Sequence, residues 1–180
     1  MTALSPPAGA AERLARIRLA RTDGIGAVGY GQLLELHGSG EAACDALLEQ
    51  RRRLADPSAI DSELRRAEAF NARHVLLGEA AYPPLLAALA DAPPLLVMLG
   101  DPAMAARPVV AMVGARNASA AGRALAHEMA LALGDAGWVV ASGLARGIDS
   151  AAHHGALDSG TIGCVAGGVD IAYPPENAGL

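Results

Sequence analysis

Two short segments combine glycine and arginine immediately after uncharged runs that are rich in valine, and the second also contains serine. The first is Gly114–Asn117 (Gly-Ala-Arg-Asn), which follows the run Val109–Val113. The second begins at Ser142, after the run Trp138–Ala141. A guanidinium can hold a phosphate group through two parallel hydrogen bonds, and glycine allows backbone amides to approach an anion closely. Both segments therefore indicate phosphate-binding loops.

The second segment, Ser142–Asp149, reads Ser-Gly-Leu-Ala-Arg-Gly-Ile-Asp. Its serine offers a hydroxyl and its first glycine a bare amide to phosphate oxygens, whereas Asp149 fits the first turn of a helix better than it fits an acid catalyst. Arg116 could instead pair with Asp149 or Asp170 as scaffolding, and Arg146 could be an ordinary solvated cation. We predict that the binding residues are Gly114, Ala115, Arg116, Ser142, Gly143, Arg146 and Gly147.

These loops lack the signatures of common nucleotide-binding and nucleophilic enzymes. The dinucleotide fingerprint needs Gly-x-Gly-x-x-Gly after the first strand, and a P-loop needs lysine, which the sequence does not contain. No Gly-x-Ser-x-Gly elbow surrounds Ser142. His153 and His154 have no cysteine or carboxylate at ligand spacing, and His153 fits a helix face packed on a sheet. We therefore expect no catalytic residue, no metal site and no cofactor.

The net charge of −5 argues mildly against broad DNA affinity, which usually needs a basic face. Without lysine, a phosphate site must use backbone amides, helix N-termini and a few arginines.

Cys44 and Cys164 lie in apolar runs, and we expect both to be buried thiols in a reducing environment. The first residues show no basic segment followed by an apolar stretch, so we expect no signal peptide. No uncharged apolar run reaches about 20 residues, so we expect a soluble, cytoplasmic protein that does not contact membranes.

The second half of the chain alternates strands and helices. Runs typical of buried strands lie at 109–113, 138–141 and 161–166. Helical segments separate them, at 118–136 and from 148 or 149 to about 157. This order predicts a parallel sheet with right-handed crossovers, in which ligands bind beyond the carboxyl ends of the strands. The two loops described above and a third, at 167–175, occupy that position.

The first 71 residues are typical of a small helical bundle. Helical spacing recurs in four segments, at 12–21, 30–36, 41–53 and from 61 towards 71. Between the first two, Gly24-Ile25-Gly26 fits either the hairpin of a helix-hairpin-helix unit, whose amides contact DNA phosphates, or an ordinary helix connection. Short strands follow at 74–77 and 95–99. We expect a helical domain over residues 1–71 and a second domain over 72–180.

Taken in order, several motifs resemble those of the DNA-processing protein A family, also called DprA or Smf. The matching segments are Tyr82–Leu86, Ala92–Leu96, Val113–Arg116, Ser142–Asp149, Ala152–Leu157, Thr161–Ile162, Gly167–Asp170 and Tyr173–Asn177. They cover residues 82–177 without a large gap, and the N-terminal helices fit the family's small helical domain. The sequence departs from the family at Ala115, where serine or threonine is usual, so a hydroxyl beside Arg116 is lost.

The resemblance implies a fold and a role that composition alone does not supply. The fold is α/β, with a Rossmann-like, mostly parallel sheet and helices on both faces, preceded by a small all-α domain of helix-hairpin-helix or SAM-like type. Members of the family bind single-stranded DNA taken up in natural transformation, help to load the RecA recombinase, commonly form homodimers and are not known as catalysts. Arg116 would hold a DNA phosphate, in a pocket shaped by Gly114, Ser142, Gly143 and Gly147.

The resemblance also implies that the family's domain continues past Leu180 with a Phe-Pro-x-Arg-Asn-Arg motif, so that the domain over 72–180 is C-terminally incomplete. Two other interpretations stay open. One is a nucleotide-binding Rossmann-like hydrolase, although the Pro-Gly-Gly-x-Gly-Thr-x-x-Glu motif of such enzymes does not occur in the sequence. The other is an inactive, truncated remnant. The expected partners are single-stranded DNA, RecA and a second copy of the chain.

Overall fold

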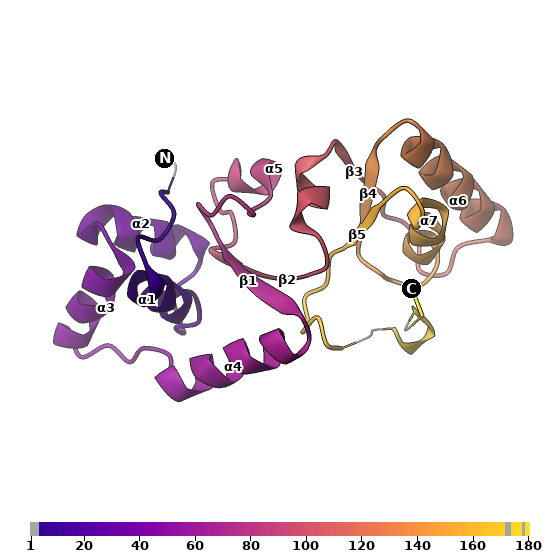
Figure 1. The fold of residues 1–180 in the computed structure, drawn as a ribbon. Helices are drawn as coiled ribbons and strands as arrows, with labels where there is room; N and C mark the ends of the chain where they lie inside the picture. Colours follow the sequence, from indigo (N-terminus) through magenta and orange to yellow (C-terminus); the bar gives the residue numbers. More distant parts are fainter. Residues whose placement is uncertain (1–3, 172–173, 178) are drawn as a thin grey trace. The chain divides into compact units, whose positions relative to one another are not determined.

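The computed structural model describes residues 4–171, 174–177 and 179–180, and packing divides the chain after Gly100 into two compact units. Among the described residues, the first unit contains four helices of ten or more residues, a one-turn helix and an antiparallel two-stranded ribbon, and the second contains a parallel sheet with two α-helices (Figure 1). Tyr173, which opens the Tyr-Pro-Pro-Glu-Asn motif, lies outside the described residues.

The first unit begins with the four helices that the sequence predicts. They are α1 (Ala10–Ala20), α2 (Ala27–His37), α3 (Gly40–Glu49) and α4 (Pro57–Ala69). Helix α4 begins earlier than expected, because Asp56 accepts a hydrogen bond from the Ser58 amide and Pro57 suits the first helical turn. Helix α3 ends before the expected residue 53, because the chain leaves the helical conformation at Arg51, where φ is +57°.

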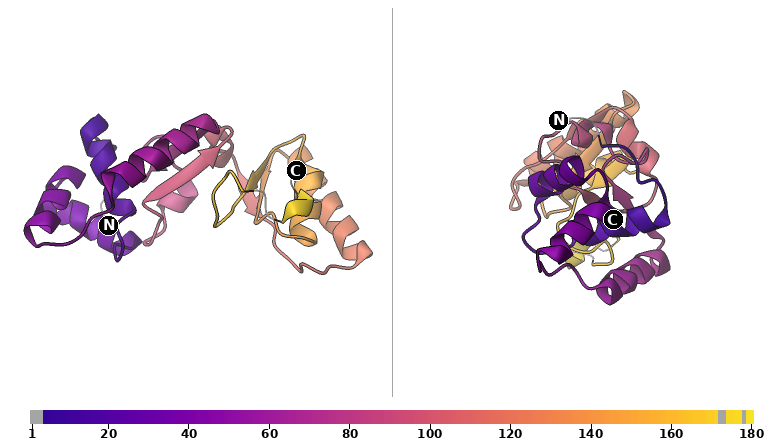
Figure 2. Two further views of the ribbon diagram at one scale, coloured as in Figure 1. Left: turned by 90° about the horizontal axis from the view of Figure 1, so that it is seen from below. Right: turned by 90° about the vertical axis from the view of Figure 1, so that its left-hand side faces the viewer.

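A two-stranded antiparallel ribbon follows α4. Strand β1 (Ala72–Leu76) pairs with β2 (Leu95–Leu99), and the one-turn helix α5 (Pro84–Ala87) lies in the connection between them. Helix α4 lies along the ribbon (Figures 1 and 2). We expected the second domain to begin at residue 72, whereas packing groups the ribbon with the helices of the first unit.

Two clusters of buried side chains form the core of the first unit. One lies among the first three helices and the segment after α3, and consists of Leu19, Tyr30, Leu34, Ala43, Cys44, Leu47 and Leu54. The other joins helices to the ribbon through Ile17, Ile60, Leu76 and Leu95. Because Leu76 and Leu95 come from the two strands, the ribbon shares its buried surface with α1 and α4. That shared burial explains why the ribbon packs as part of the first unit.

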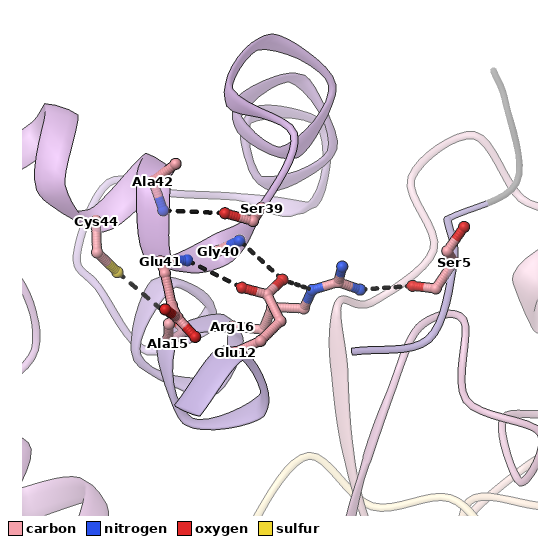
Figure 3. Close-up of polar contacts among 9 residues, drawn as sticks. All are labelled: Ser5, Glu12, Ala15, Arg16, Ser39, Gly40, Glu41, Ala42 and Cys44. Carbon is pink, nitrogen blue, oxygen red and sulfur yellow. Dashed lines mark hydrogen bonds and ion pairs between the residues drawn. The ribbon is translucent and has the colours of Figure 1, made fainter. Parts of the chain in front are cut away.

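A buried carboxylate, Glu12 of α1, holds the first turn of α3 (Figure 3). Its oxygens accept hydrogen bonds from the Gly40 amide at 2.8 Å, from the Glu41 amide at 3.0 Å and from the Arg16 guanidinium at 2.5 Å. Arg16 also donates to the Ser5 carbonyl at 2.7 Å. Burial by itself would raise the pKa of Glu12, but the two amides and Arg16 together outweigh burial and lower it. The carboxylate therefore stays charged inside the unit.

The second unit has the β-α-β-α-β order that the sequence predicts. Its elements are β3 (Val109–Ala111), α6 (Ala120–Asp135), β4 (Val139–Ser142), α7 (Ile148–Ala156) and β5 (Thr161–Gly163). The strands pair in parallel in the order β3-β4-β5, which confirms the predicted α/β class. Both crossovers run in the same direction and α6 packs against α7, so the two helices cover one face of the sheet. In the described part of this unit, no α-helix covers the other face, where we also expected helices.

Small side chains form the core of the second unit, namely Val140 of β4, Ala130 of α6, and Ala152 and Ala156 of α7. Strands β3 and β5 are shorter than predicted, because the chain turns away from the sheet soon after each of them. Cys164 directly follows β5 and is exposed, so the prediction of a buried thiol was wrong for it, whereas Cys44 is buried as predicted. None of the helices in the described ranges is long and apolar enough to cross a bilayer.

Replacing Glu12 with alanine should lower the free energy of unfolding of the first unit by about 3 kcal/mol. The substitution leaves the buried Arg16 guanidinium and the first amides of α3 without their partner. Urea titration followed by far-UV circular dichroism measures the change. Glu35→Ala, at an exposed position of α2, is the matched control and should cost less than about 0.5 kcal/mol. An E12A chain as stable as this control would show that the carboxylate does not hold α3.

Candidate phosphate-binding site

The loops after β3 and β4 come together at the carboxyl ends of the parallel strands, as the sequence predicts, and Asn177, just past the third predicted loop at 167–175, also reaches them. The loop after β3 contacts the loop after β4, because the Ile148 amide donates to the Ala115 carbonyl at 3.3 Å. A Cβ atom on Gly147 would lie only 2.2 Å from that carbonyl oxygen, so a larger residue at 147 would separate the loops. From the segment after β5, the side-chain amide of Asn177 donates to the Leu144 carbonyl at 2.8 Å.

The Asp149 carboxylate shapes the loop after β4 from inside. Asp149 is buried in the first turn of α7, as predicted, and accepts hydrogen bonds from the Gly143 amide at 3.1 Å and the Ala145 amide at 3.4 Å. Between those amides, Leu144 has a φ of +55°, a conformation that bulky residues rarely adopt. Such a conformation persists only where the surroundings determine it, and Asp149 provides that restraint on both sides of Leu144.

Ser142 and Gly143 use their hydrogen-bond donors within the protein. The Ser142 hydroxyl donates to the Met112 carbonyl at 2.6 Å and thereby ties the end of β4 to the segment after β3. The Gly143 amide is occupied by the buried carboxylate described above. We expected both groups to face phosphate oxygens. In the structure their donors instead fix the shape of the loop.

Backbone amides and one guanidinium remain free beside these fixed groups. Within the described part of the chain, the amides of residues 114–117 and 146–147 donate no hydrogen bond. The exposed Arg116 side chain forms no ion pair with Asp149 or Asp170, the carboxylates considered as its partners, or with any other described residue. Free peptide N–H groups next to a free guanidinium are the donors that a phosphate oxygen needs.

Arg146 provides a second accessible cation. Its side chain is 64% exposed, and the Glu176 carboxylate, itself 63% exposed, is 3.9 Å away. An ion pair of this length between exposed groups is weak and leaves the guanidinium available. Gly114, by contrast, has a packing role, because a Cβ atom there would lie 2.6 Å from Cγ1 of Ile148. The predicted set therefore divides into accessible donors around Arg116 and Arg146 and residues that hold the loops together.

His153 of α7 is buried against the sheet, as predicted for a residue on the packed helix face. Its Nδ1 lies 2.7 Å from the Thr161 hydroxyl oxygen, and that hydroxyl donates to the Val140 carbonyl at 2.8 Å. Because the hydroxyl proton is already used, Nδ1 is the donor and carries the ring's proton. Nε2 has no partner among the described residues. Burial lowers the pKa of His153 below its usual 6.5, against the opposing effect of the Asp149 charge.

Asp149 and Asn177 position the loop after β4, a role that was not predicted for either residue, although both lie in motifs that resemble the family's. Asn177 links two segments, because its amide nitrogen donates to the Leu144 carbonyl while its amide oxygen accepts from the Ser150 hydroxyl at 3.0 Å. A positioning role for Asn177 could have been inferred from the polar end of the Tyr-Pro-Pro-Glu-Asn motif, because this motif follows β5 in the sequence. Both residues act on the shape of the loop and leave the accessible donors free.

Family models match both halves of the chain. One, described as DprA-like N-terminal HHH domain, matches residues 10–69, and another, described as DNA recombination-mediator protein A, matches residues 73–180. The chain belongs to the DNA recombination-mediator protein A family. The family's N-terminal model spans α1–α4 and includes the Gly24–Gly26 turn. Its larger model includes all three loops of the candidate site.

Three curated relatives support membership of this family. The DNA processing protein DprA of Bacillus subtilis (strain 168) is 35% identical over 102 residues, 55% of this chain and 34% of that protein. Its namesake from Streptococcus pneumoniae (strain ATCC BAA-255 / R6) is 33% identical over 137 residues, 75% of this chain and 46% of that protein. Protein Smf of Synechocystis sp. is 29% identical over 152 residues, 81% and 37% respectively. The chain spans less than half the length of these relatives.

The fold also matches a solved structure of the family. The X-ray structure of DNA processing protein A (DprA) from Streptococcus pneumoniae matches 93% of this chain and 62% of that chain, with a TM-score of 0.73 and 24% sequence identity. At this level of identity the likeness concerns the fold alone. It confirms the combination of a helical N-terminal part with a parallel α/β sheet that the sequence predicts.

Gly147→Ala should destabilise the second unit by about 2 kcal/mol or more, because φ is +86° at this position and the new Cβ atom would overlap the Ala115 carbonyl. Thermal unfolding followed by the fluorescence of Trp138, the only tryptophan of the chain, measures the loss. Gly167→Ala is the matched control, because no atom lies within 4 Å of a Cβ atom there. Equal melting temperatures for the two variants would rule out the close loop contact.

The second unit should also lose stability as the pH falls below about 6.5. The unfolded chain takes up a proton on His153 at the ordinary pKa, whereas the folded chain takes it up only at lower pH, so protonation favours unfolding in this window. Urea midpoints from Trp138 fluorescence, measured at about pH 7.5 and about pH 5.5, report the difference. His153→Gln should flatten this dependence, while exposed His154→Gln should keep it. A wild-type midpoint that does not fall would contradict the buried neutral imidazole.

Proposed function

We propose that the loops after β3 and β4 bind the backbone phosphates of single-stranded DNA. The proposal rests on one observation, the free Arg116 guanidinium beside the free amides of residues 114–117 in a chain whose basic side chains are arginines and histidines. Amides and guanidinium groups hold phosphate oxygens whatever the base sequence, which suits a ligand of arbitrary sequence. The names of the relatives, DNA processing protein, and of the family, recombination mediator, support DNA as the ligand.

Each predicted residue has a distinct role in this proposal. Arg116 anchors one phosphate, and the amides of Gly114 and Ala115 donate to the same group. Arg146 and the Gly147 amide reach the strand from the neighbouring loop. Ser142 and Gly143 position that loop through their bonds to Met112 and Asp149 and do not donate to the DNA. Ala115, which lacks a hydroxyl, contributes only its backbone.

Single-stranded DNA suits this site better than a duplex. A duplex-binding protein usually presents a broad basic face that contacts many phosphates at once. Here the accessible cations of the site are two arginines on adjacent loops, and the whole chain has a net charge of −5. The backbone of a single strand is flexible enough to bend into a short loop site and to bring its phosphates to a few fixed donors.

The wider role that we propose follows the family. The protein binds single-stranded DNA that enters in natural transformation, acts in the cytoplasm, and passes the DNA to RecA, working as a homodimer. It binds without breaking bonds in the DNA. The placement of Asp149 and His153 supports this, because the first is occupied by two amides and the second is buried against Thr161. Neither group is positioned to transfer a proton at a phosphate held by Arg116.

Arg116→Ala should weaken binding to a fluorescently labelled oligo-dT and reduce the slope of log K against log salt concentration by about 0.7, the contribution of one phosphate of a single strand. Fluorescence anisotropy at several salt concentrations measures both quantities. Arg66→Ala, at an exposed position of α4, is the charge-matched control and should leave both unchanged. Equal slopes for R116A and wild type would remove Arg116 from the site, and a folded wild-type chain that does not bind oligo-dT would refute the proposed function.

A further inference from the structure

A pocket of about 580 Å³ opens at the surface of α6 and α7, next to the loop after β4. Its lining residues are Arg123 and His127 from α6, and Gly147, Ser150, Ala151 and His154 from α7 and the residue before it. They offer a guanidinium and two imidazoles as donors, whereas the Ser150 hydroxyl already donates to Asn177, and there is no carboxylate among the described residues that line the pocket. Of these six residues, Gly147 lies in the loop after β4, and the other five lie in α6 and α7.

Close packing of the two helices brings these donors together. A Cβ atom on Gly155 of α7 would lie 2.3 Å from the His127 carbonyl oxygen and 3.0 Å from Cβ of Ala130, so the helices approach as closely as glycine permits. His154, next to Gly155 in α7, and His127 of α6 therefore line the same pocket. The Arg123 guanidinium donates to the Ala118 carbonyl at 2.7 Å, which holds this exposed side chain at the start of α6.

The lining favours an anion over a metal ion or an apolar ligand. A guanidinium repels a metal cation, and the described residues contain no group of three or more metal-ligating side chains. A neutral imidazole still has one N–H donor, so the two histidines can donate to an oxyanion without first taking up a proton. A phosphate group, with several acceptor oxygens, matches donors that converge from two helices.

We propose that this pocket holds a second phosphate of the same DNA strand that Arg116 anchors, so that the strand continues from the loops across the surface of α6 and α7. This inference rests on the proposed function. Gly147 connects the pocket to the Arg116 loop, because it lines the pocket and also lies against the Arg116 carbonyl. The oxygen of that carbonyl would be 2.7 Å from a Cβ atom on Gly147. The backbone that carries the first anchor thus forms one wall of the second site.

Two variants test the pocket, Arg123→Ala and the double variant His127→Ala/His154→Ala. All three side chains are exposed, so the substitutions leave the core unchanged. In anisotropy titrations with labelled oligo-dT, we expect R123A to bind at least about fivefold more weakly at low salt and to lose about 0.7 from the salt slope. Combined with R116A, the loss of slope should reach about 1.4, because the two residues contact different phosphates.

Imidazole NMR signals give a readout that does not depend on affinity. The ring signals of His127 and His154 should shift when the wild-type chain is saturated with oligo-dT, while the signals of His37, in the first unit, should not. The matched controls for the binding assay are Arg66→Ala and His37→Ala, which should bind as the wild type does.

The outcomes separate this inference from the proposed function. If R116A weakens binding while the pocket variants bind normally and the two imidazole signals do not move, the pocket is refuted and the proposed function stands. If the pocket variants weaken binding and R116A does not, the pocket is supported and Arg116 is not the anchor. A folded wild-type chain that does not bind oligo-dT refutes both.

Discussion

The Asp149 carboxylate accepts hydrogen bonds from the Gly143 and Ala145 amides, and this contact folds the loop after β4 back onto the start of α7. The other features of the candidate site depend on it. The folded loop forces Leu144 to a positive φ and brings Gly147 against the loop after β3. Because two amides turn inward, the amides next to Arg116 and at residues 146–147 are the ones left for a ligand. The cost of burying the carboxylate is offset by donors that would otherwise have been unsatisfied.

The first unit also contains a buried carboxylate that holds backbone amides in place. Glu12 is buried, and its carboxylate accepts from the first amides of α3 while Arg16 balances its charge. Aromatic residues make up 3% of the chain, so neither core can depend on large rings to fix its packing. Close approach of backbones, at Gly40 in one unit and at Gly155 in the other, compensates for the small side chains. In both units a specific polar contact then sets the geometry of a turn, which the apolar contacts alone would leave loosely defined.

The sequence predicted the helices and strands well, but it predicted the contacts between distant segments less well. Hydrophobic spacing predicted four N-terminal helices and the β-α-β-α-β order, because both depend on residues within one or two turns of each other. Strand ends and the burial of Cys164 depend on what packs over the sheet, which spacing does not encode. The glycines of the loops were recognised as turn residues from their type alone, but the need for glycine at a given position depends on distant residues. Gly147, for example, is required by the carbonyl of Ala115, which lies far earlier in the sequence. The same holds for Asn177 and for the pocket lined by His127 and His154, which exist only once separate segments pack together.

A chain with a net charge of −5 can bind a polyanion if its attractive groups are close to the ligand and its repulsive ones are distant. At physiological salt the screening length is about 8 Å, so carboxylates elsewhere on the surface contribute little at the site itself. Backbone amides are suited to such a chain, because they donate to phosphate without adding net charge, and their positions are set by the fold rather than by flexible side chains. Arg116 and Arg146 then need only supply the local attraction. In the proposed site, placement of donors by the loops thus replaces the broad basic surface that the composition lacks.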